Sequence, residues 1–510
     1  MKLNTLIIIA MLGSLISTIA CDSISQKEFI DYLKIGENSY VGISTIQENL
    51  DVPWDIQFNE STNSLFVTEI KGRLSEIDLS DNSMHHLYDV PNVFHERTAG
   101  LLGMAIHPDF IKKPFIYVCY TVKNGEKIFS ELAKLEYKDR KVVGSKIVLK
   151  IEGANGHNGS RLLFDNEGYL YWATGDAHSL THAQDSTTLN GKVLRMTEDG
   201  HIPTDNPIAN SYVYAWGFRN IQGMTLTAKG NIMTSEHGDA IEDEINWVRP
   251  RHNYGWIEIE GYHDTEQEKI IASKGPLTEP IKAWTPVIAP AGLKYYAHSS
   301  IPEWENSLLL VSLKNQSLRV LKLDANQTKI VEEKTYLKDH YGRMRAVTTD
   351  NKGNVYIATS NRDWNPQKGF PVKTDDRILK IEKIVTKPET YLSEYVEDKS
   401  LIKDGKTLYN MYCMSCHKED GKGITGTFPP LVKTPTIENK EKLIRIILNG
   451  LHGKIKVNGV KYDQAMPSFK FLSDQEIAKI ASYVRTGFGN SLSAIGETEV
   501  MLSRQDSIKN

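Results

Sequence analysis

A turn followed by a short β-rich run recurs through the first three quarters of the chain, and this repeat restricts the possible folds more than any other feature. Each copy carries Asn, Asp or Gly in the turn and ends in small or polar residues. The copies lie roughly 45–80 residues apart, a spacing typical of propeller blades with loop insertions. The six copies are Asn59–Glu69, His107–Thr121, Asp165–Asp176, Thr227–Glu236, Glu303–Leu313 and Thr349–Ser360.

Six copies predict six blades, and therefore a mainly β domain, a six-bladed β-propeller, over residues 44–385. The alternative is a β-sandwich with similar hairpins. A sandwich of roughly 340 residues in one domain would be unusual. Because the chain has 510 residues, at least one further domain is expected.

Helical periodicity is nearly absent from the propeller region and returns near the C-terminus. Residues 401–412 predict one helix, and the capping box at 473–476 starts another that ends near Gly487. The expected order is a linker over 386–400, a small all-α domain over 401–490 and a polar, loose tail over 491–510.

The all-α region contains Cys413-Met414-Ser415-Cys416-His417, which has the C-x-x-C-H pattern of a c-type haem attachment site. The Cys413 and Cys416 thiols would bond covalently to the haem, and His417 would ligate its iron. The alternative is a chance cysteine pair beside a histidine. That alternative is weakened because the whole chain has only 4 cysteines.

Met466 is the predicted second ligand of the haem iron, because it is the one methionine between His417 and the tail. A thioether opposite an imidazole raises the iron's potential, which suits an acceptor of electrons from an organic cofactor. The alternatives are His452 as the ligand, giving a lower potential, or Met466 as a core filler. With Pro429-Pro430 as the pair that orients His417, the domain resembles a class I cytochrome c.

The N-terminus predicts an export signal over residues 1–20, with Lys2 before an apolar run too short to span a membrane. Cys21 follows a small residue, as in a bacterial lipoprotein, and would then be acylated. The alternative is a plain secretory signal, which Thr18 favours because a Leu is usual there. With either signal we expect a periplasmic or cell-surface protein, and a lipoprotein signal would also hold it at the membrane through its lipid. Residues 21–43 are expected to be a linker.

The charge balance argues against a nucleic-acid partner, since the net charge is −4 and no basic block stands out. Cys119 lies in an apolar, strand-like run and is expected to be a buried core thiol. No disulfide framework is predicted.

Eleven short segments, in order over roughly residues 44–385, resemble the quinoprotein sugar dehydrogenases, the soluble glucose/sorbosone dehydrogenase family that uses pyrroloquinoline quinone (PQQ). Each segment alone is weak evidence, and the ordered set is specific. They are PW at 53, GLLG at 100 with HPDF at 107, HNGSRL at 157, GD at 175, GFRNIQG at 217, SEHG at 235, DEIN at 243, NYGW at 253, SLK at 312 and RMR at 343.

The resemblance implies that the propeller holds PQQ, a flat tricarboxylate that requires positive charge. Arginine matches a carboxylate with a two-pronged fork. Arg343 and Arg345 lie two apart on an expected strand and so face one way; the alternative is a pair of solvated surface arginines. The implied PQQ-binding residues are Arg219, Asn220, His237, Lys314, Arg343 and Arg345.

The resemblance also implies the catalytic residues. His157 would be the general base that takes the hydroxyl proton, since a neutral imidazole suits this at pH 7. Asp176 would orient His157, and Arg219 would contact the quinone oxygens. A satisfied structural histidine is the default alternative, but His157 lies in a Gly-flanked turn, which favours function.

Calcium is the third implied group. The carbonyls of Gly238 and Asp239 would hold a Ca²⁺ against the quinone. Glu244 and the Tyr254 carbonyl would hold a second, structural Ca²⁺, the alternative being a solvated acidic loop. The chain departs from the family pattern at five positions, which leaves the substrate open: Thr98, Ser160, Phe218, His237 and Asp239.

The resulting hypothesis is an exported quinohaemoprotein dehydrogenase. It would oxidise an aldose sugar or related alcohol at PQQ, then pass electrons to its own haem and on to a respiratory acceptor. The alternatives are a sorbosone-type aldehyde dehydrogenase with the same cofactor, or a non-catalytic propeller that binds glycans or proteins.

Overall fold

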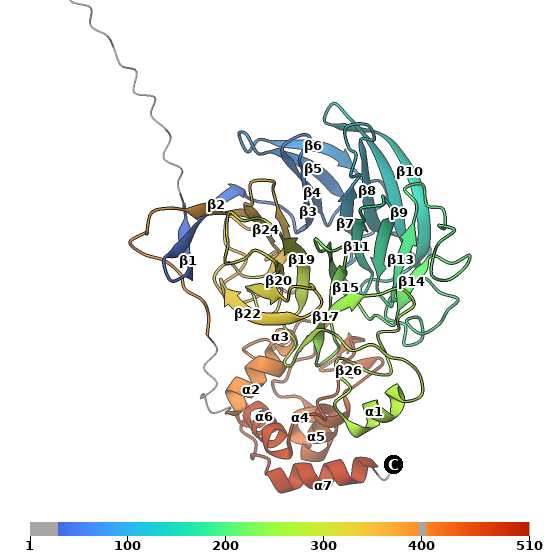
Figure 1. Ribbon diagram of the computed structural model, residues 1–510. Helices are drawn as coiled ribbons and strands as arrows, with labels where there is room; N and C mark the ends of the chain where they lie inside the picture. Colours follow the sequence, from blue (N-terminus) through green and yellow to red (C-terminus); the bar gives the residue numbers. More distant parts are fainter. Residues whose placement is uncertain (1–28, 397–403, 509–510) are drawn as a thin grey trace, which may run out of the picture.

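The computed structural model describes residues 29–396 and 404–508, which form a large β domain and a smaller helical one (Figure 1). The expected export signal and Cys21 lie outside the described residues. Within the described ranges, no helix is both long and apolar enough to cross a bilayer.

Six antiparallel sheets form a ring of blades, so the predicted six-bladed propeller is confirmed. The innermost strands of neighbouring blades contact one another around a closed circle in the order β3, β7, β11, β15, β19 and β23. The first five blades run outward in chain order. They are β3 Pro53–Asn59, β4 Ser64–Glu69, β5 Arg73–Asp78, β6 Met84–Asp89; β7 Leu101–Ile106, β8 Phe115–Asn124, β9 Lys127–Lys138, β10 Lys141–Gly153; β11 Gly159–Phe164, β12 Leu170–Thr174, β13 Lys192–Met196, β14 Val213–Trp216; β15 Ile221–Leu226, β16 Ile232–Glu236, β17 Asp243–Val248, β18 Lys282–Trp284; and β19 Pro290–Tyr296, β20 Ser307–Ser312, β21 Leu318–Leu323, β22 Ile330–Tyr336.

The sixth blade joins the two ends of the propeller chain. Its strands are β23 Met344–Thr349, β24 Val355–Thr359, β25 Ile378–Ile384, then β2 Ser39–Gln47 and β1 Asp31–Gly36. The expectation of a linker over 21–43 is therefore wrong from residue 31 onward. Tyr40, Val41 and Ile43 of β2 are buried, and Ile43 pairs with Ile381 on β25. The repeat did not reveal them because β2 joins the blade by pairing with β25, more than 300 residues away, and β1 pairs with β2.

Each of the six sequence repeats is the turn and second strand of one blade, namely β4, β8, β12, β16, β20 or β24. These strands have neighbours on both sides within their sheets, which explains their continuous apolar runs. Cys119 on β8 is fully buried and free, as expected. The one helix in this region, α1 (Glu266–Ala272), buries none of its residues and left no periodic signal.

The C-terminal domain packs its helices around a shared apolar core. The capping box at Ser473 and the end at Gly487 are confirmed for α6. The elements are α2 Gly405–Tyr412, α3 Met414–His417, α4 Pro435–Glu438, α5 Lys440–Asn449, β26 Ile455–Val457, β27 Val460–Tyr462, α6 Asp474–Thr486 and α7 Glu497–Ile508.

Two details of this domain differ from the expectation. A small hairpin, β26–β27, turns at Asn458 and Gly459, whose φ values of +49° and +85° suit an Asn-Gly turn. The tail is not loose, because α7 buries Val500 completely against the domain core. Its weak periodicity concealed this contact.

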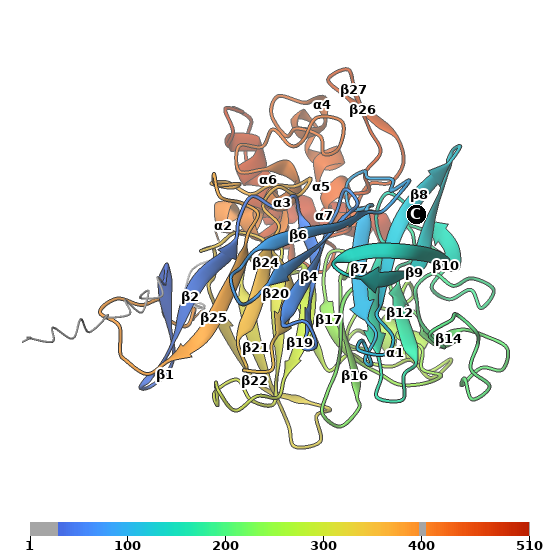
Figure 2. The same cartoon turned by 90° about the horizontal axis from the view of Figure 1, so that it is seen from above.

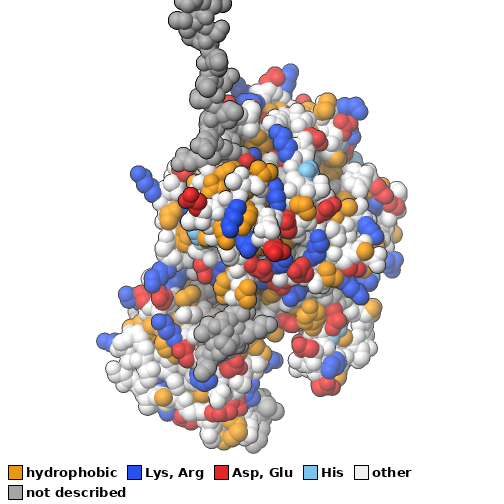
Figure 3. Space-filling model, turned by 60° about the vertical axis from the view of Figure 1, so that its left-hand side comes forward, with side chains coloured by type: hydrophobic (Ala, Val, Ile, Leu, Met, Phe, Trp, Pro, Cys, Tyr) orange, Lys and Arg blue, Asp and Glu red, His pale blue; other side chains and the backbone are white. Residues whose placement is uncertain are grey.

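The helical domain lies against one end of the propeller, as two perpendicular views agree (Figures 1 and 2). The described part of the expected linker follows the edge of the sixth blade: Leu392 exchanges backbone hydrogen bonds of 2.8 Å with Tyr32 and Lys34 on β1. On the face shown in Figure 3, acidic and basic side chains are interspersed.

Candidate active site

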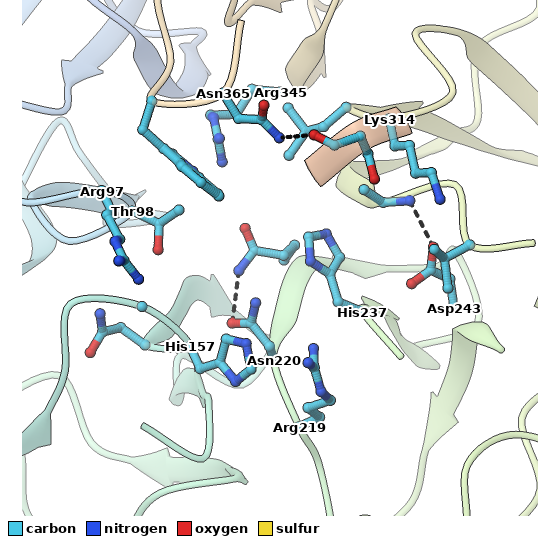
Figure 4. Close-up of a pocket in the computed structure, with 18 of the residues that line it drawn as sticks. Arg97, Thr98, His157, Arg219, Asn220, His237, Asp243, Lys314, Arg345 and Asn365 are labelled. Carbon is cyan, nitrogen blue, oxygen red and sulfur yellow. Dashed lines mark hydrogen bonds between the residues drawn. The ribbon is translucent and has the colours of Figure 1, made fainter. Parts of the chain in front are cut away.

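A cavity of about 290 Å³ lies where the inner ends of the blades converge, close to the lower limit of volumes that hold cofactors. All six blades contribute to its wall, through an innermost strand or the loop before it. Figure 4 shows the labelled side chains surrounding this space. One representative from each blade is Trp54, Leu102, Gly159, Gln222, Ala289 and Arg345.

His157 and Asp176 form a hydrogen-bonded pair at this cavity. The His157 Nδ1–H donates to Asp176 Oδ1 at 2.9 Å, and the indole N–H of Trp256 donates to Asp176 Oδ2 at 2.8 Å. His157 lies in a tight turn, with φ of +53°. A Cβ on Gly159 would lie 2.7 Å from the backbone of the next strand, so the turn requires glycine there.

Burial and the positive charge of Arg219 lower the pKa of His157, although the Asp176 carboxylate opposes them. Burial disfavours the charged form of Asp176, yet His157 and Arg219 lower the pKa of that carboxyl. The pair is therefore a neutral imidazole beside an ionised carboxylate. With Nδ1 bonded to Asp176, the lone pair is left on Nε2, as a general base requires.

Positive charge dominates the cavity wall. Arg343 and Arg345 both bond to one carboxylate, Asp363, at 3.1 and 2.5 Å, and Arg219 pairs with Asp239 at 2.7 Å. The Nε atoms of Arg219 and Arg343 are buried without a hydrogen-bond partner. The charged lining residues are Arg97, Arg219, Lys314, Arg343, Arg345, Asp239 and Asp243.

This excess of cations and the two unpartnered guanidinium nitrogens fit a polyanionic ligand such as PQQ. The cavity thus brings together Arg219, Lys314, Arg343 and Arg345, as the resemblance implied. Burial lowers the pKa of Lys314, and Asp243 opposes this shift.

Asn220 and His237 also line the cavity. The side-chain oxygen of Asn220 accepts from the Gly159 N–H at 3.2 Å, which ties Asn220 to the turn that carries His157. His237 donates through Nε2 to the Pro290 carbonyl at 2.9 Å. Burial lowers the pKa of His237 to about 3, with Arg219 adding to the effect, so this ring is neutral.

Gly238 and Asp239, the implied ligands of the first calcium, both lie on the cavity wall near Arg219. The Gly238 N–H donates to Asp243 at 2.9 Å, and the Asp239 N–H donates to Glu260 at 2.9 Å. No group of three or more His, Cys, Asp or Glu side chains arranged to hold a metal is found among the described residues. A calcium here would depend on backbone carbonyls and on the cofactor itself.

Glu244, implied for the second calcium, lies in a buried acidic region on β17. Its carboxylate accepts from Asn246 Nδ2 at 2.8 Å and from the Gly261 N–H at 2.7 Å. The carbonyl oxygen of the Asn246 side chain is buried without a partner, which suits a hard cation beside Glu244. Tyr254 stacks on Phe218, with ring centroids 4.6 Å apart.

Three of the four predicted haem-binding residues line a second, largely apolar cavity in the helical domain, whereas Cys416 lines the propeller cavity. Cys413, His417 and Met466 lie on its wall, and the His417 Nδ1–H donates to the Pro429 carbonyl at 2.9 Å. Nε2 is then free for iron, which fits a covalently bound haem. His452, the alternative ligand, is exposed and does not line this cavity.

Several lining residues were not singled out from the sequence. The ring of His178 lies 3.9 Å from that of His157, and burial lowers its pKa to about 3. Its position two residues after Asp176 was the one available signal. Trp364 and Asn365 also line the cavity, from a loop without a motif. Of the five departures, Thr98, His237 and Asp239 line the cavity, whereas Ser160 and Phe218 are fully buried beside it.

Comparison with known proteins identifies both domains. The family model described as Glucose / Sorbosone dehydrogenase matches residues 50–365, and the Cytochrome c model matches residues 402–488. Aldose sugar dehydrogenase YliI of Escherichia coli is 30% identical over 357 residues, covering 65% of this chain and 93% of its own. Cytochrome c-552 of Thermus thermophilus is 39% identical over 93 residues, covering 17% of this chain and 70% of its own.

Solved structures agree with this division. The PQQ-bound aldose sugar dehydrogenase of Streptomyces coelicolor superposes with a TM-score of 0.59 at 27% identity, covering 68% of this chain and 98% of its own. The first family model alone spans more than half of the chain. The protein therefore belongs to the glucose/sorbosone dehydrogenase family, and its C-terminal domain is a cytochrome c domain.

Proposed function

We propose that this protein is a PQQ-dependent dehydrogenase that oxidises an aldose sugar, or a related alcohol, at a CH–OH group and delivers the electrons to its own haem. One observation carries the proposal. A neutral imidazole held by a carboxylate faces a cavity whose other side is cationic, and the haem-attachment segment closes that same cavity. When bound, PQQ would supply the acceptor for the hydride.

Different residues of the chain would carry out proton transfer and cofactor binding. His157 Nε2 takes the proton of the substrate hydroxyl, and Asp176 holds the ring and balances the charge that it gains. Arg343, Arg345 and Lys314 hold the carboxylates of the cofactor. The Escherichia coli and Streptomyces coelicolor relatives are named aldose sugar dehydrogenases, which supports an aldose as substrate.

The first test is reconstitution of the haem-loaded protein with PQQ and Ca²⁺, followed by aldoses, alcohols and aldehydes. We expect reduction of an added dye and of the haem with an aldose. His157→Ala should lose at least about 10²-fold in turnover, since a positioned base contributes this much or more. It should still bind PQQ in equilibrium dialysis.

His201→Ala, at an exposed position outside the cavity, is the matched control. Tight PQQ binding without oxidation of any substrate would contradict the proposed activity. Full turnover in His157→Ala would contradict the role of the base.

We also propose that the protein is exported and anchored by a lipid at Cys21. The support is the apolar run before a small residue and cysteine, together with covalent haem attachment through two thiols. In cells that express the gene, wild type should incorporate labelled palmitate and fractionate with membranes. Cys21→Ser should lose both properties, whereas Cys119→Ser should keep them; equal labelling of Cys21→Ser would rule the anchor out.

A further inference from the structure

One short helix separates the two cavities. Ser415 and Cys416 of α3 line the cationic cavity of the propeller, whereas Cys413 and His417, on either side of them, line the apolar cavity of the cytochrome domain. The partition between the two sites is therefore a single turn of helix. It carries Cys416 and His417, and Cys413 stands at its N-cap.

Polar contacts hold this helix against the propeller. The side-chain N–H of Asn365 donates to the Ser415 carbonyl at 3.1 Å, as Figure 4 shows, and the Lys418 ammonium donates to the Asn365 side-chain oxygen. Asn365 is only 8% exposed, so its side of these hydrogen bonds is shielded from water. Lys368 pairs with Glu419 at 2.6 Å beside them.

The contact extends to both sides of α3. Arg97 donates to Gln464 of the cytochrome domain, both on the cavity wall, and the rings of Trp364 and Phe428 meet with centroids 5.8 Å apart. Ala240, next to the expected calcium ligands, belongs to the same apolar cluster as the core of the cytochrome domain. A domain connected to the propeller only through the linker would not need these polar and apolar contacts with it.

We propose that the cytochrome domain is a fixed wall of the active-site cavity and that electrons cross to the haem through α3, with the Asn365–Ser415–Lys418 contacts as its clamp. This inference rests on the proposed dehydrogenase function. Each substrate oxidation releases two electrons and two protons. A haem iron held by His417 and Met466 would accept one electron at a time, going from iron(III) to iron(II). An external one-electron acceptor must therefore take the first electron from the haem before the haem can accept the second.

The opposing possibility is a tethered shuttle that meets the propeller only by chance encounters. Its transfer rate would follow the effective concentration set by the linker, which falls roughly as the −3/2 power of linker length. A clamped domain should not respond in this way, because its contacts and not the linker hold it in place.

The first experiment exchanges charges at the clamp without changing net charge. In Lys418→Glu with Glu419→Lys, a carboxylate faces the Asn365 oxygen and an ammonium faces Lys368. The matched control is Asp420→Lys with Lys422→Asp, which inverts a pair lying 3.2 Å apart within its own loop. None of these four residues lines the cationic cavity.

We expect the clamp variant to reduce its haem about tenfold more slowly in stopped-flow with substrate, because like charges across an interface are costly. Its dye-linked substrate oxidation should persist, because none of the exchanged residues lines the cavity. Its radius of gyration in small-angle scattering, measured without PQQ or substrate, should increase, while the control keeps the wild-type values. Clamp and control variants that behave alike would overturn the inference.

The second experiment inserts 15 flexible residues between 396 and 404. If the domain is a fixed wall, the rate of haem reduction should change less than about twofold, and the two domains should stay as compact in small-angle scattering as in the wild type. If the domain is a shuttle, haem reduction should slow severalfold and the particle should expand. Slowing of that size would overturn the inference. If no form oxidises any substrate with the dye, the proposed function has failed, and scattering of the two variants still decides whether the domain is fixed.

Discussion

At the scale of single residues, the site combines what the sequence marks with what it conceals. His157 stands in a Gly-flanked turn, and the pairing with Asp176 follows the family pattern; the structure brings the two within 2.9 Å. His178 lies just beyond the GD segment and Asn365 lies in a segment without a motif, yet both line the cavity. Local sequence shows which residues are chemically suited to a site, and the folded loops select which of them meet.

The Asp176 carboxylate should control the pH dependence of oxidation. Because burial and Arg219 lower the pKa of His157, the acid limb of dye-linked kcat/KM should lie below the ordinary histidine value of 6.5. Asp176 raises that pKa, so Asp176→Asn should move the limb to still lower pH while turnover falls by about 10²-fold. Asp185→Asn, later in the same loop between β12 and β13, is the control. Movement of the acid limb to higher pH in Asp176→Asn would contradict this prediction.

Met466 should set the potential of the haem. Replacing its thioether by an imidazole in Met466→His should lower the midpoint potential on the order of 0.1 V, since axial ligands tune haem over a wide range. Spectroelectrochemistry measures this directly. Met501→His, at a position 41% exposed on α7, should leave the potential unaltered. An unchanged potential in Met466→His would assign the ligand elsewhere.

At the scale of elements, β17 and the loops beside it hold more buried carboxylate than their surroundings neutralise. Burial raises the pKa of Glu244 and Glu260 to about 7 and that of Glu242 to about 8. From the sequence alone, a run of acidic residues is as consistent with a solvated loop as with a cation site. Only burial, which depends on packing against the neighbouring blade and the cytochrome domain, distinguishes the two.

Calcium should therefore stabilise the protein most at high pH. The pKa of these glutamates is higher in the folded protein than the value of 4.5 in the unfolded chain. Without calcium, they therefore contribute stability that is present below pH 4.5 and is lost as the pH rises toward about 8. Excess Ca²⁺ should raise Tm by about 5 °C at pH 8 and much less at pH 5. Glu244→Gln should raise the calcium-free Tm at pH 8 and shrink the calcium response.

Glu258→Gln, at an exposed position nearby, is the control for calorimetry. A calcium response of equal size at both pH values, or one that survives Glu244→Gln, would argue against a cation in the acidic region.

At the scale of the whole molecule, ring closure and domain docking join segments that are far apart in sequence. Strands β1 and β2 complete the blade begun by β23, and α3 completes the wall of the propeller cavity. Neither contact leaves a periodic or motif signal, because its two halves lie in different regions of the chain. The repeat count nevertheless predicts the number of blades, since every blade carries its own copy.

Removing β1 and β2 should prevent stable folding. Tyr40, Val41 and Ile43 are at most 5% exposed, and burying each contributes about 1.5–3 kcal/mol. Their sum is comparable to the total stability of many domains, about 5–15 kcal/mol. A chain starting at residue 48 should lack cooperative thermal unfolding of the propeller, whereas one starting at residue 29 should unfold like the full chain. Equal transitions would show that the ring closes without these strands.

The sequence by itself determines the two domains, the number of blades, the haem-attachment motif and the chemical character of the cofactor site. These depend on local repeats, fixed spacings and residue types. The tertiary structure alone decides that the cavity cations share one carboxylate, that the acids of β17 are buried, and that one turn of helix separates the two cavities. Those features arise where distant segments pack together, and burial and distance are properties of the packed chain rather than of any stretch within it.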